Sequence, residues 1–382
     1  MSLSVSQKAR LYLEYRAGGG TSYVKYSCFE KLSNVVAVIL DCDGVLIDEK
    51  TSYDKVIKES TTLLTEILTG YRLESNEPLT KTLYDIRAVG SFNNDAHTIQ
   101  LLVEWTLAKI DSELDPEVMK RLEVLAGKSF DEILAYRQLK GYVAAPVLER
   151  WLNELKAKIS KLEGTAAPLG SVEEELSLDP ILTAAVKKVL QPEQPYGKGL
   201  LVTVFDESFY GSSEITRVRN SGPFFDFEGR LKNEKVLVSE ATMNFLAEKR
   251  FALGICTGRG SWETWKTLGG LERYFHKPSC IFIGDHIIRD PGHANIYEKP
   301  NPWSLIEAVK NLEKQGPVLY VGNSAEDHLM YVRAKQQMEE LLFAGVTDND
   351  FRKLDYMLEN EADVVIPTVN HLVKIFQLID EF

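Results

Sequence analysis

Two acidic residues one position apart, Asp41 and Asp43, follow a run of six apolar residues and precede Gly44. Paired carboxylates at this spacing can bind a metal ion, act as a nucleophile or transfer a proton. The same residues also suit an ordinary turn at the end of a strand, because Asp and Gly are common in turns. This stretch alone leaves the two interpretations nearly even.

Three further polar segments follow apolar, strand-like runs later in the chain. Residues 257–259 (Thr-Gly-Arg) could present a hydroxyl and a backbone N–H to an anion. Lys299 lies in a proline-stiffened loop and could supply a positioned cation. Residues 322–327 combine glycine with the oxygen ligands that Mg²⁺ prefers. Taken singly, each also fits a plain structural role: a turn, an exposed lysine and a helix N-cap.

A parallel sheet is the element that would bring these segments together. The continuous apolar run 35–40 predicts a central strand covered on both faces. After residue 235, helical and strand-like patterns alternate, which predicts βα units with right-handed crossovers. The expected strands are 35–40, 251–256, 280–284, 318–321, 341–346 and 362–366, and the expected helices are 239–249, 262–267, 302–314, 326–340, 350–359 and 370–379. Open α/β sheets place ligands at the carboxyl ends of their strands, where all four polar segments lie.

Residues 49–235 have helical periodicity and predict a separate, mostly α-helical domain inserted between 35–48 and 236–382. The expected helices are 55–68, 98–110, 147–162 and 181–190, with a linker at 163–179 and an irregular segment at 211–230. The apolar stripe of 147–162 could form a dimer seam, but packing within the domain is favoured because the stripe is too short for a coiled coil. Residues 1–34 are expected to be an N-terminal extension, with a short helix at 7–16 and a flexible break at 18–20.

Length and composition limit the class of protein. The 382 residues exceed one typical core, which favours two domains, and the net charge of −12 argues against a nucleic-acid partner. No apolar run is long enough to span a membrane and no secretory signal is visible, so a cytoplasmic protein without a membrane partner is expected. Cys28, Cys42, Cys256 and Cys280 show no CxxC spacing, which indicates reduced thiols rather than a zinc site or disulfides.

The order of the polar segments resembles the haloacid dehalogenase-like (HAD) superfamily. The matching motifs are Asp41-x-Asp43-Gly-Val-Leu, Thr257-Gly258-Arg259, Lys299-Pro300-x-Pro302 and Gly322-x-Ser324-x-x-Asp327. The resemblance covers residues 35–48 and 236–382, and the inserted domain lies where the family carries a C1-type cap. Residues 86–95 resemble a cap segment of the phosphoglycolate-phosphatase-like branch. The resemblance implies a Rossmann-like α/β core with a large helical cap.

The resemblance also implies roles for the matching residues in a Mg²⁺-dependent phosphatase. Asp41 would attack phosphorus and form an aspartyl-phosphate, and Asp43 would protonate the leaving alcohol and later deprotonate water. Thr257 would hold phosphate oxygens and Lys299 would offset charge. The implied phosphate-binding residues are Cys42, Gly44, Thr257, Gly258, Arg259 and Lys299, and the implied Mg²⁺ ligands are Asp41, the Asp43 carbonyl, Asn323 and Asp327.

One residue departs from the family pattern: Asn323 stands where the family most often has Asp. An amide oxygen can bind Mg²⁺ but brings no charge, so weaker Mg²⁺ binding, or compensation by Glu326, is expected.

Other functions remain open on the same fold. A phosphomutase shares the aspartyl-phosphate, and a non-catalytic binding protein is another alternative, whereas Asp43 argues against a dehalogenase. The expected partner is a small phosphorylated metabolite of unknown identity, and the oligomeric state is open. Polar candidates for specificity in the inserted domain are Arg87, Asn93, Asn94, His97, Arg217 and Arg219, although surface or capping roles are the more common ones for such residues.

Overall fold

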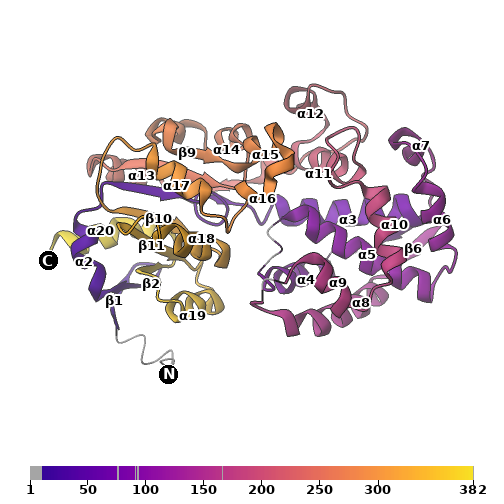
Figure 1. Cartoon of the computed structure of the whole chain (residues 1–382), viewed down its shortest axis with the longest axis horizontal. Coiled ribbons are helices and arrows are strands. Elements are labelled where there is room, and N and C mark those ends of the chain that lie inside the picture. Colours follow the sequence, from indigo (N-terminus) through magenta and orange to yellow (C-terminus); the bar gives the residue numbers. More distant parts are fainter. Residues whose placement is uncertain (1–10, 75–76, 91, 93, 166, 382) are drawn as a thin grey trace. The chain divides into compact units, whose positions relative to one another are not determined.

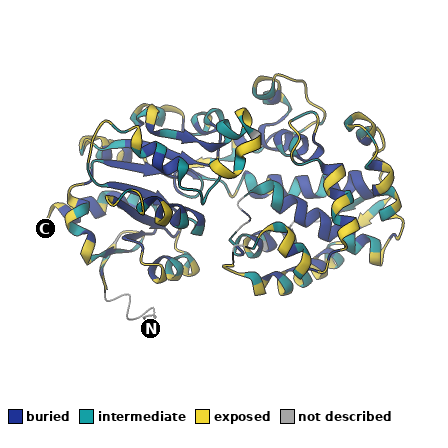
Figure 2. Ribbon diagram, viewed as in Figure 1, coloured by how far each residue is buried: buried dark blue, intermediate teal, exposed yellow. Residues whose placement is uncertain are grey.

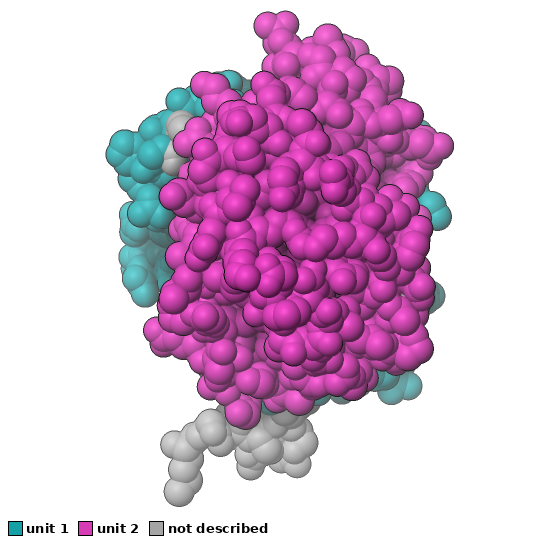
Figure 3. All heavy atoms as spheres, turned by 90° about the vertical axis from the view of Figure 1, so that its right-hand side faces the viewer, with its two compact units in different colours: residues 1–49, 234–382 teal, residues 50–233 magenta. Residues whose placement is uncertain are grey.

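The computed structural model describes residues 11–74, 77–90, 92, 94–165 and 167–381. The chain divides into two compact units, drawn in different colours in Figure 3. Unit 1 comprises Met1–Glu49 and Glu234–Phe382, and unit 2 comprises Lys50–Asn233. The second part of unit 1 begins at Glu234, two residues before the predicted start at residue 236.

Unit 1 contains an eight-stranded sheet with the order β1-β2-β12-β11-β10-β3-β8-β9 (Figure 1). Its strands are β1 Tyr12–Ala17, β2 Gly20–Lys25, β3 Ala37–Leu40, β8 Ala252–Thr257, β9 Cys280–Phe282, β10 Val318–Gly322, β11 Leu341–Val346 and β12 Val364–Ile366. The six strands from β12 to β9 run parallel to one another. All four residues of β3 are buried, as expected for a central strand. The predicted α/β class with a parallel core is confirmed.

The N-terminal segment forms two strands of this sheet, which corrects the prediction of a separate extension. β1 and β2 pair as an antiparallel hairpin, and β2 then pairs with β12. Gly19 has a φ of +105°, so the expected flexible break is a turn that needs glycine. The expected helix is wrong over residues 12–16: Leu13 and Tyr15 face one core and Tyr12 faces the other, which is the period of a strand. Residues 7–10 of that prediction lie outside the described residues.

Helices cover both faces of the sheet, whose central strands are buried (Figure 2). Alternate residues of β3 enter different cores: Val38 and Leu40 on one face, Ala37 and Ile39 on the other. The first face packs against α2 (Phe29–Ser33), α13 (Glu240–Glu248), α14 (Ser261–Leu268) and α20 (Leu372–Asp380). The second packs against α17 (Trp303–Lys310), α18 (Ala325–Lys335) and α19 (Phe351–Glu359). The strand ends therefore have a rigid three-layer support.

Several predicted elements of unit 1 end earlier than expected. The strand at 280–284 stops at Phe282, because α15 (Ile283–Arg289) begins there and brings Gly284 against the backbone of Arg259 and Gly260. The helix predicted at 302–314 ends at Lys310, and the one at 326–340 ends at Lys335. Two short segments, η7 (Pro291–His293) and α16 (Ala294–Tyr297), follow α15.

Unit 2 is mostly helical, as predicted, with a single apolar core. Its helices are α3 Tyr53–Thr69, α4 Glu77–Arg87, α5 Asp95–Glu113, α6 Val118–Leu125, α7 Phe130–Ala135, α8 Ala145–Ile159, α9 Leu169–Glu175, α10 Pro180–Leu190, α11 Leu200–Tyr210 and α12 Ser212–Arg219. β5 (Tyr71–Leu73) and β6 (Gly141–Val143) form a small parallel pair.

Two stretches of unit 2 expected to be irregular contain helices, because each buries one apolar anchor: Val172 of α9 and Ile215 of α12. The apolar stripe of α8 is buried inside the unit, which agrees with packing rather than a dimer seam. None of the helices in the described ranges is both long enough and apolar enough to cross a membrane.

Candidate active site

The two acids lie directly beyond the carboxyl end of β3. The backbone N–H of Asp41 donates to the carbonyl of Val321 at 2.9 Å, which extends the pairing of β3 with β10 by one residue. The carbonyl of Cys42 then accepts from three successive N–H groups, and Gly44 has a φ of +69°. This tight turn fixes Asp43 two residues after Asp41 at the same edge of the sheet.

Lys299 lies between two buried carboxylates. Its Nζ is 2.8 Å from Oδ1 of Asp41 and 2.8 Å from Oδ1 of Asp327. Burial alone would lower the pKa of Lys299, but Asp327 and Asp41 hold it well above its usual value, so the side chain stays charged. Burial raises the pKa of Asp41 to about 7, against the opposing effect of Lys299.

Asp327, at the start of α18, has both oxygens occupied by hydrogen bonds. Its five donors are Lys299 Nζ, Tyr320 OH at 2.6 Å, the backbone N–H groups of Asn323 and Ser324 at 3.1 Å each, and Ser324 Oγ at 2.7 Å. Burial would raise the pKa of Asp327, but Lys299 and these donors lower it overall. Asp327 therefore holds Lys299 and the loop before α18. Direct metal coordination would require it to release some of these donors.

Arg259, predicted to bind phosphate, is engaged by two carboxylates. Its Nη1 donates to Oδ1 of Asp43 at 2.9 Å, and its Nη2 lies 2.7 Å from both oxygens of Glu234. Thr267 Oγ1 donates to Glu234 Oε2 at 2.7 Å. Burial raises the pKa of Asp43, the positive charge of Arg259 lowers it, and the negative charge of Glu234 raises it further. The Asp43 side chain remains 33% exposed. The exposed part of the side chain leaves the Asp43 carboxyl accessible to solvent.

The remaining predicted phosphate-binding residues are placed around this edge. Thr257 ends β8, is fully buried, and its hydroxyl accepts from the Arg259 N–H at 3.3 Å. Gly258 is exposed, with no atoms within 4 Å of the position a Cβ would take. Cys42 is buried, and burial raises the pKa of its thiol well above the usual value, so its side chain is not a reactive thiolate.

The residues around Asp41 suit a Mg²⁺ ion in charge and ligand type. When ionised, Asp41, Asp43, Asp327 and Glu234 leave two negative charges in excess over Lys299 and Arg259. Nδ2 of Asn323 is 1.8 Å from where a Cβ on Gly44 would be, so this amide lies directly against the turn after Asp43. Within the described residues, no three His, Cys, Asp or Glu side chains form a metal site by themselves. Backbone and amide oxygens would have to complete the set.

Most of the polar candidates of unit 2 have structural partners. Arg87 Nη1 donates to Asp54 at 2.7 Å, Asn94 caps α5, and Arg219 donates two hydrogen bonds to Asp206 at 2.6 and 3.0 Å. His97 lies on α5, where burial lowers its pKa, and Arg217 lies on α12. Asn93 lies outside the described residues.

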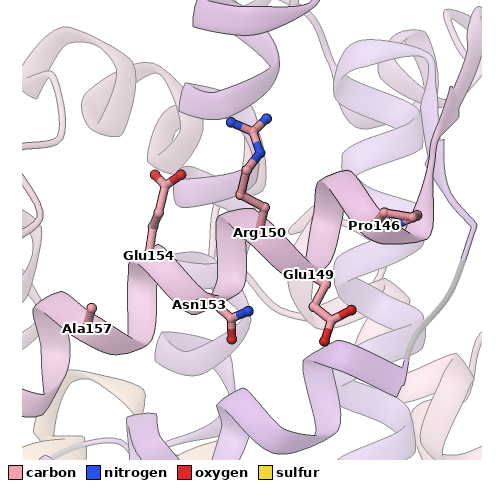
Figure 4. Close-up of a pocket in the computed structure, with 6 residues that line it drawn as sticks. All are labelled: Pro146, Glu149, Arg150, Asn153, Glu154 and Ala157. Atoms are coloured by element: carbon pink, nitrogen blue, oxygen red, sulfur yellow. The ribbon is translucent and has the colours of Figure 1, made fainter.

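Two hollows in unit 2 contain none of the predicted site residues. One, of about 530 Å³, runs along α8 and is lined by residues of that helix alone (Figure 4). The other, of about 590 Å³, is lined by α3, Arg72, Arg137 and residues 224–227. Because residues of a single helix line the hollow along α8, it is an open groove on the surface.

Sequence reasoning missed two residues of the site. Glu234 precedes β7 (Lys235–Val236), and no local sequence pattern distinguishes this buried glutamate from the exposed glutamates of the chain. Tyr320 is an ordinary aromatic residue of β10 whose hydroxyl donates to Asp327. The sequence hints at this role only by placing Tyr320 two residues before the end of a strand that a polar motif follows.

No protein-family model and no curated protein sequence matches this chain. Solved structures do, among them one from Lactobacillus plantarum described as a putative phosphoglycolate phosphatase and one from Thermotoga maritima described as a putative beta-phosphoglucomutase. The first is 11% identical, with a TM-score of 0.39 over 90% of this chain and 99% of its own. The second is 16% identical, with a TM-score of 0.35 over 90% and 98%. Similarity at this level carries no argument about activity.

The architecture defines the class of protein. Polar segments at the carboxyl ends of β3, β8 and β10 meet at one edge of a parallel sheet. Lys299 reaches the same edge from the loop between α16 and α17, not from a strand end as predicted. A helical unit is inserted after β3 and the short β4 (Ile47–Asp48). This is the fold that the resemblance to the HAD superfamily implies, with the N-terminal hairpin added at one side. The chain is an α/β protein with a mostly parallel sheet and an inserted helical unit.

Proposed function

We propose that this protein is a phosphatase that hydrolyses a small phosphorylated metabolite, with Asp41 as the nucleophile. The observation that carries the proposal is the pairing of Asp41 with Lys299, 2.8 Å apart, at the carboxyl end of the central strand. A carboxylate that must attack an anionic phosphoryl group needs a fixed neighbouring cation, because phosphoryl transfer depends chiefly on positioning and charge neutralisation.

The proposed reaction has two steps. An oxygen of Asp41 attacks phosphorus, the ester P–O bond breaks, and Asp43 gives its proton to the departing alcohol oxygen. Asp43, now a carboxylate, then takes a proton from water as the water oxygen attacks the aspartyl-phosphate, which releases phosphate and restores Asp41. Lys299 offsets negative charge in both steps, and the exposed part of Asp43 gives it access to substrate and water.

A bound Mg²⁺ would neutralise phosphoryl oxygens and orient them toward Asp41. The Asp41 carboxylate, the Asp43 carbonyl and the Asn323 amide oxygen are the proposed ligands. Asp327 supports the site by holding Lys299, because its oxygens are already engaged.

The test is hydrolysis of p-nitrophenyl phosphate with Mg²⁺ or with EDTA. Asp41→Asn should lower kcat by roughly 10³-fold or more, because it removes the nucleophile. Asp355→Asn, the same change at an exposed position of α19, is the matched control and should keep full activity. An inactive wild-type protein, or an Asp41→Asn variant that turns over normally, would contradict the proposal.

A further inference from the structure

We infer that Glu234 is a positioning residue of this site: it fixes the Arg259 guanidinium, which in turn fixes the Asp43 carboxylate for proton transfer. This inference rests on the proposed function and adds a residue from outside the four motifs. Glu234, Arg259 and Asp43 together form what we call the Glu234 relay.

The relay is defined by closely spaced, buried contacts. Arg259 uses different nitrogens for its two partners, Nη1 for Asp43 at 2.9 Å and Nη2 for Glu234 at 2.7 Å. The side chains of Glu234 and Arg259 are 0% and 1% exposed. A planar guanidinium held by anions on two of its nitrogens has a fixed orientation as well as a fixed position. Oδ1 of Asp43 is thereby held while a third of its side chain remains exposed.

The backbone ties both ends of the relay to one ribbon. β7, which begins directly after Glu234, pairs antiparallel with β4, with Ile47 opposite Val236. The N–H of Leu237 donates to the carbonyl of Leu46 at 2.8 Å, and the N–H of Gly44 donates to Ile47 at 2.8 Å. The turn that carries Asp43 and the segment that carries Glu234 are therefore connected by backbone hydrogen bonds as well as through Arg259.

The environment of Glu234 indicates a site built for this contact. Ionised carboxylates are seldom fully buried without a partner, since losing water is costly. Glu234 meets that cost with Arg259 and with the hydroxyl of Thr267, which donates to Oε2 at 2.7 Å. If Arg259 served only to bind phosphate, a second buried anion beside it would weaken that role.

A positioning role predicts an effect that depends on the leaving group. A poor leaving group needs the proton from Asp43, whereas p-nitrophenolate departs almost without it. Glu234→Gln keeps the shape but loses the charge that orients Arg259. We expect kcat/KM to fall roughly tenfold for phenyl phosphate and no more than about twofold for p-nitrophenyl phosphate, which steepens the dependence of rate on leaving-group pKa.

The experiment measures kcat/KM with a series of substituted phenyl phosphates for four proteins: wild type, Glu234→Gln, Glu234→Asp and the control Glu248→Gln, an exposed glutamate of α13. Glu234→Asp retains the charge and should recover part of the phenyl phosphate activity. A further variant, Thr267→Val, removes only the hydroxyl that donates to Glu234. It should steepen the dependence of kcat/KM on leaving-group pKa less than Glu234→Gln does, and it keeps the test available should Glu234→Gln fold poorly.

The outcomes separate the two proposals. A wild-type protein inactive on every substrate overturns the proposed function and the relay with it. An active wild type in which Glu234→Gln lowers all substrates by the same factor, or none, overturns the relay alone. A selective loss with poor leaving groups, absent in Glu248→Gln, supports the relay.

Discussion

Replacement of Lys299 by Met should destabilise the protein strongly, because this one ammonium serves two buried carboxylates. The Lys299 side chain is 10% exposed, Asp41 is 9% exposed and Asp327 is fully buried. Methionine has a similar length and removes only the charge and the donors. The variant would leave two carboxylates close together, with no cation between them.

The expected cost follows from the burial of these groups. Removing one partner of a buried ion pair costs about 3–5 kcal/mol, whereas an exposed pair contributes about 0–1 kcal/mol. Asp41 offers a partial escape, since its pKa is already raised to about 7 and it can take up a proton. A raised native pKa means that the native state binds the extra proton, so stability falls as pH rises through that value. The loss in Lys299→Met should therefore be smaller near about pH 6 and approach 3–5 kcal/mol near about pH 8.5.

Urea unfolding followed by circular dichroism, with EDTA present, measures this loss at both pH values. The control is Lys310→Met, which breaks an exposed pair with Glu307 in the same unit and should change the free energy of unfolding by less than about 1 kcal/mol. Adding Asp327→Asn to Lys299→Met should recover about 1–3 kcal/mol through coupling of the pair. A loss below about 1 kcal/mol that does not vary with pH, or strictly additive effects in the double variant, would refute the reasoning.

Two further predictions concern a buried acid of unit 2 and the amide of the metal site. Glu104 is fully buried, accepts from Gln100 at 2.8 Å, and burial raises its pKa to about 8, so stability should fall as pH rises from about 4.3 to 8. Glu104→Gln should remove that fall and give a higher Tm than wild type at about pH 8, with little difference near about pH 4; unchanged pH dependence in thermal melts would contradict this. Asn323→Asp should tighten Mg²⁺ binding measured by isothermal titration calorimetry, because it adds a charged ligand beside Gly44, and weaker or unchanged binding would count against the proposed ligand set.

The parts of the fold that sequence predicts well are those where one local signal dominates. The run 35–40 is apolar throughout because β3 is covered on both faces, so its period and length specify a central strand. β11 (Leu341–Val346) follows from the same signal. The N-terminal hairpin was missed because its side chains are divided between two cores and its edge position leaves polar residues exposed. Such a pattern is ambiguous until the neighbouring strand is known.

The candidate site divides in the same way. Asp41 directly follows an apolar strand, and Asp43 and Lys299 stand next to glycine and proline, so residue type and position give a signal together. Contacts between segments that lie far apart in the sequence give no such signal. Glu234 and Arg259, for example, are brought together by the pairing of β7 with β4. The role of Arg259 therefore could not be taken from its motif alone.

The two reactive acids are supported in parallel ways, which explains how one site can hold a nucleophile and a proton donor. Asp41 shares Lys299 with the fully buried Asp327, and Asp43 shares Arg259 with the fully buried Glu234. A cation facing a single carboxylate would lower the pKa of that acid and hold it firmly as a carboxylate. Burial raises the pKa of both Asp41 and Asp43, and the second carboxylate on each cation adds to this, so both pKa values stay raised while the acids remain fixed in place. In the proposed mechanism, Asp327 and Glu234 would thus influence Asp41 and Asp43 through Lys299 and Arg259.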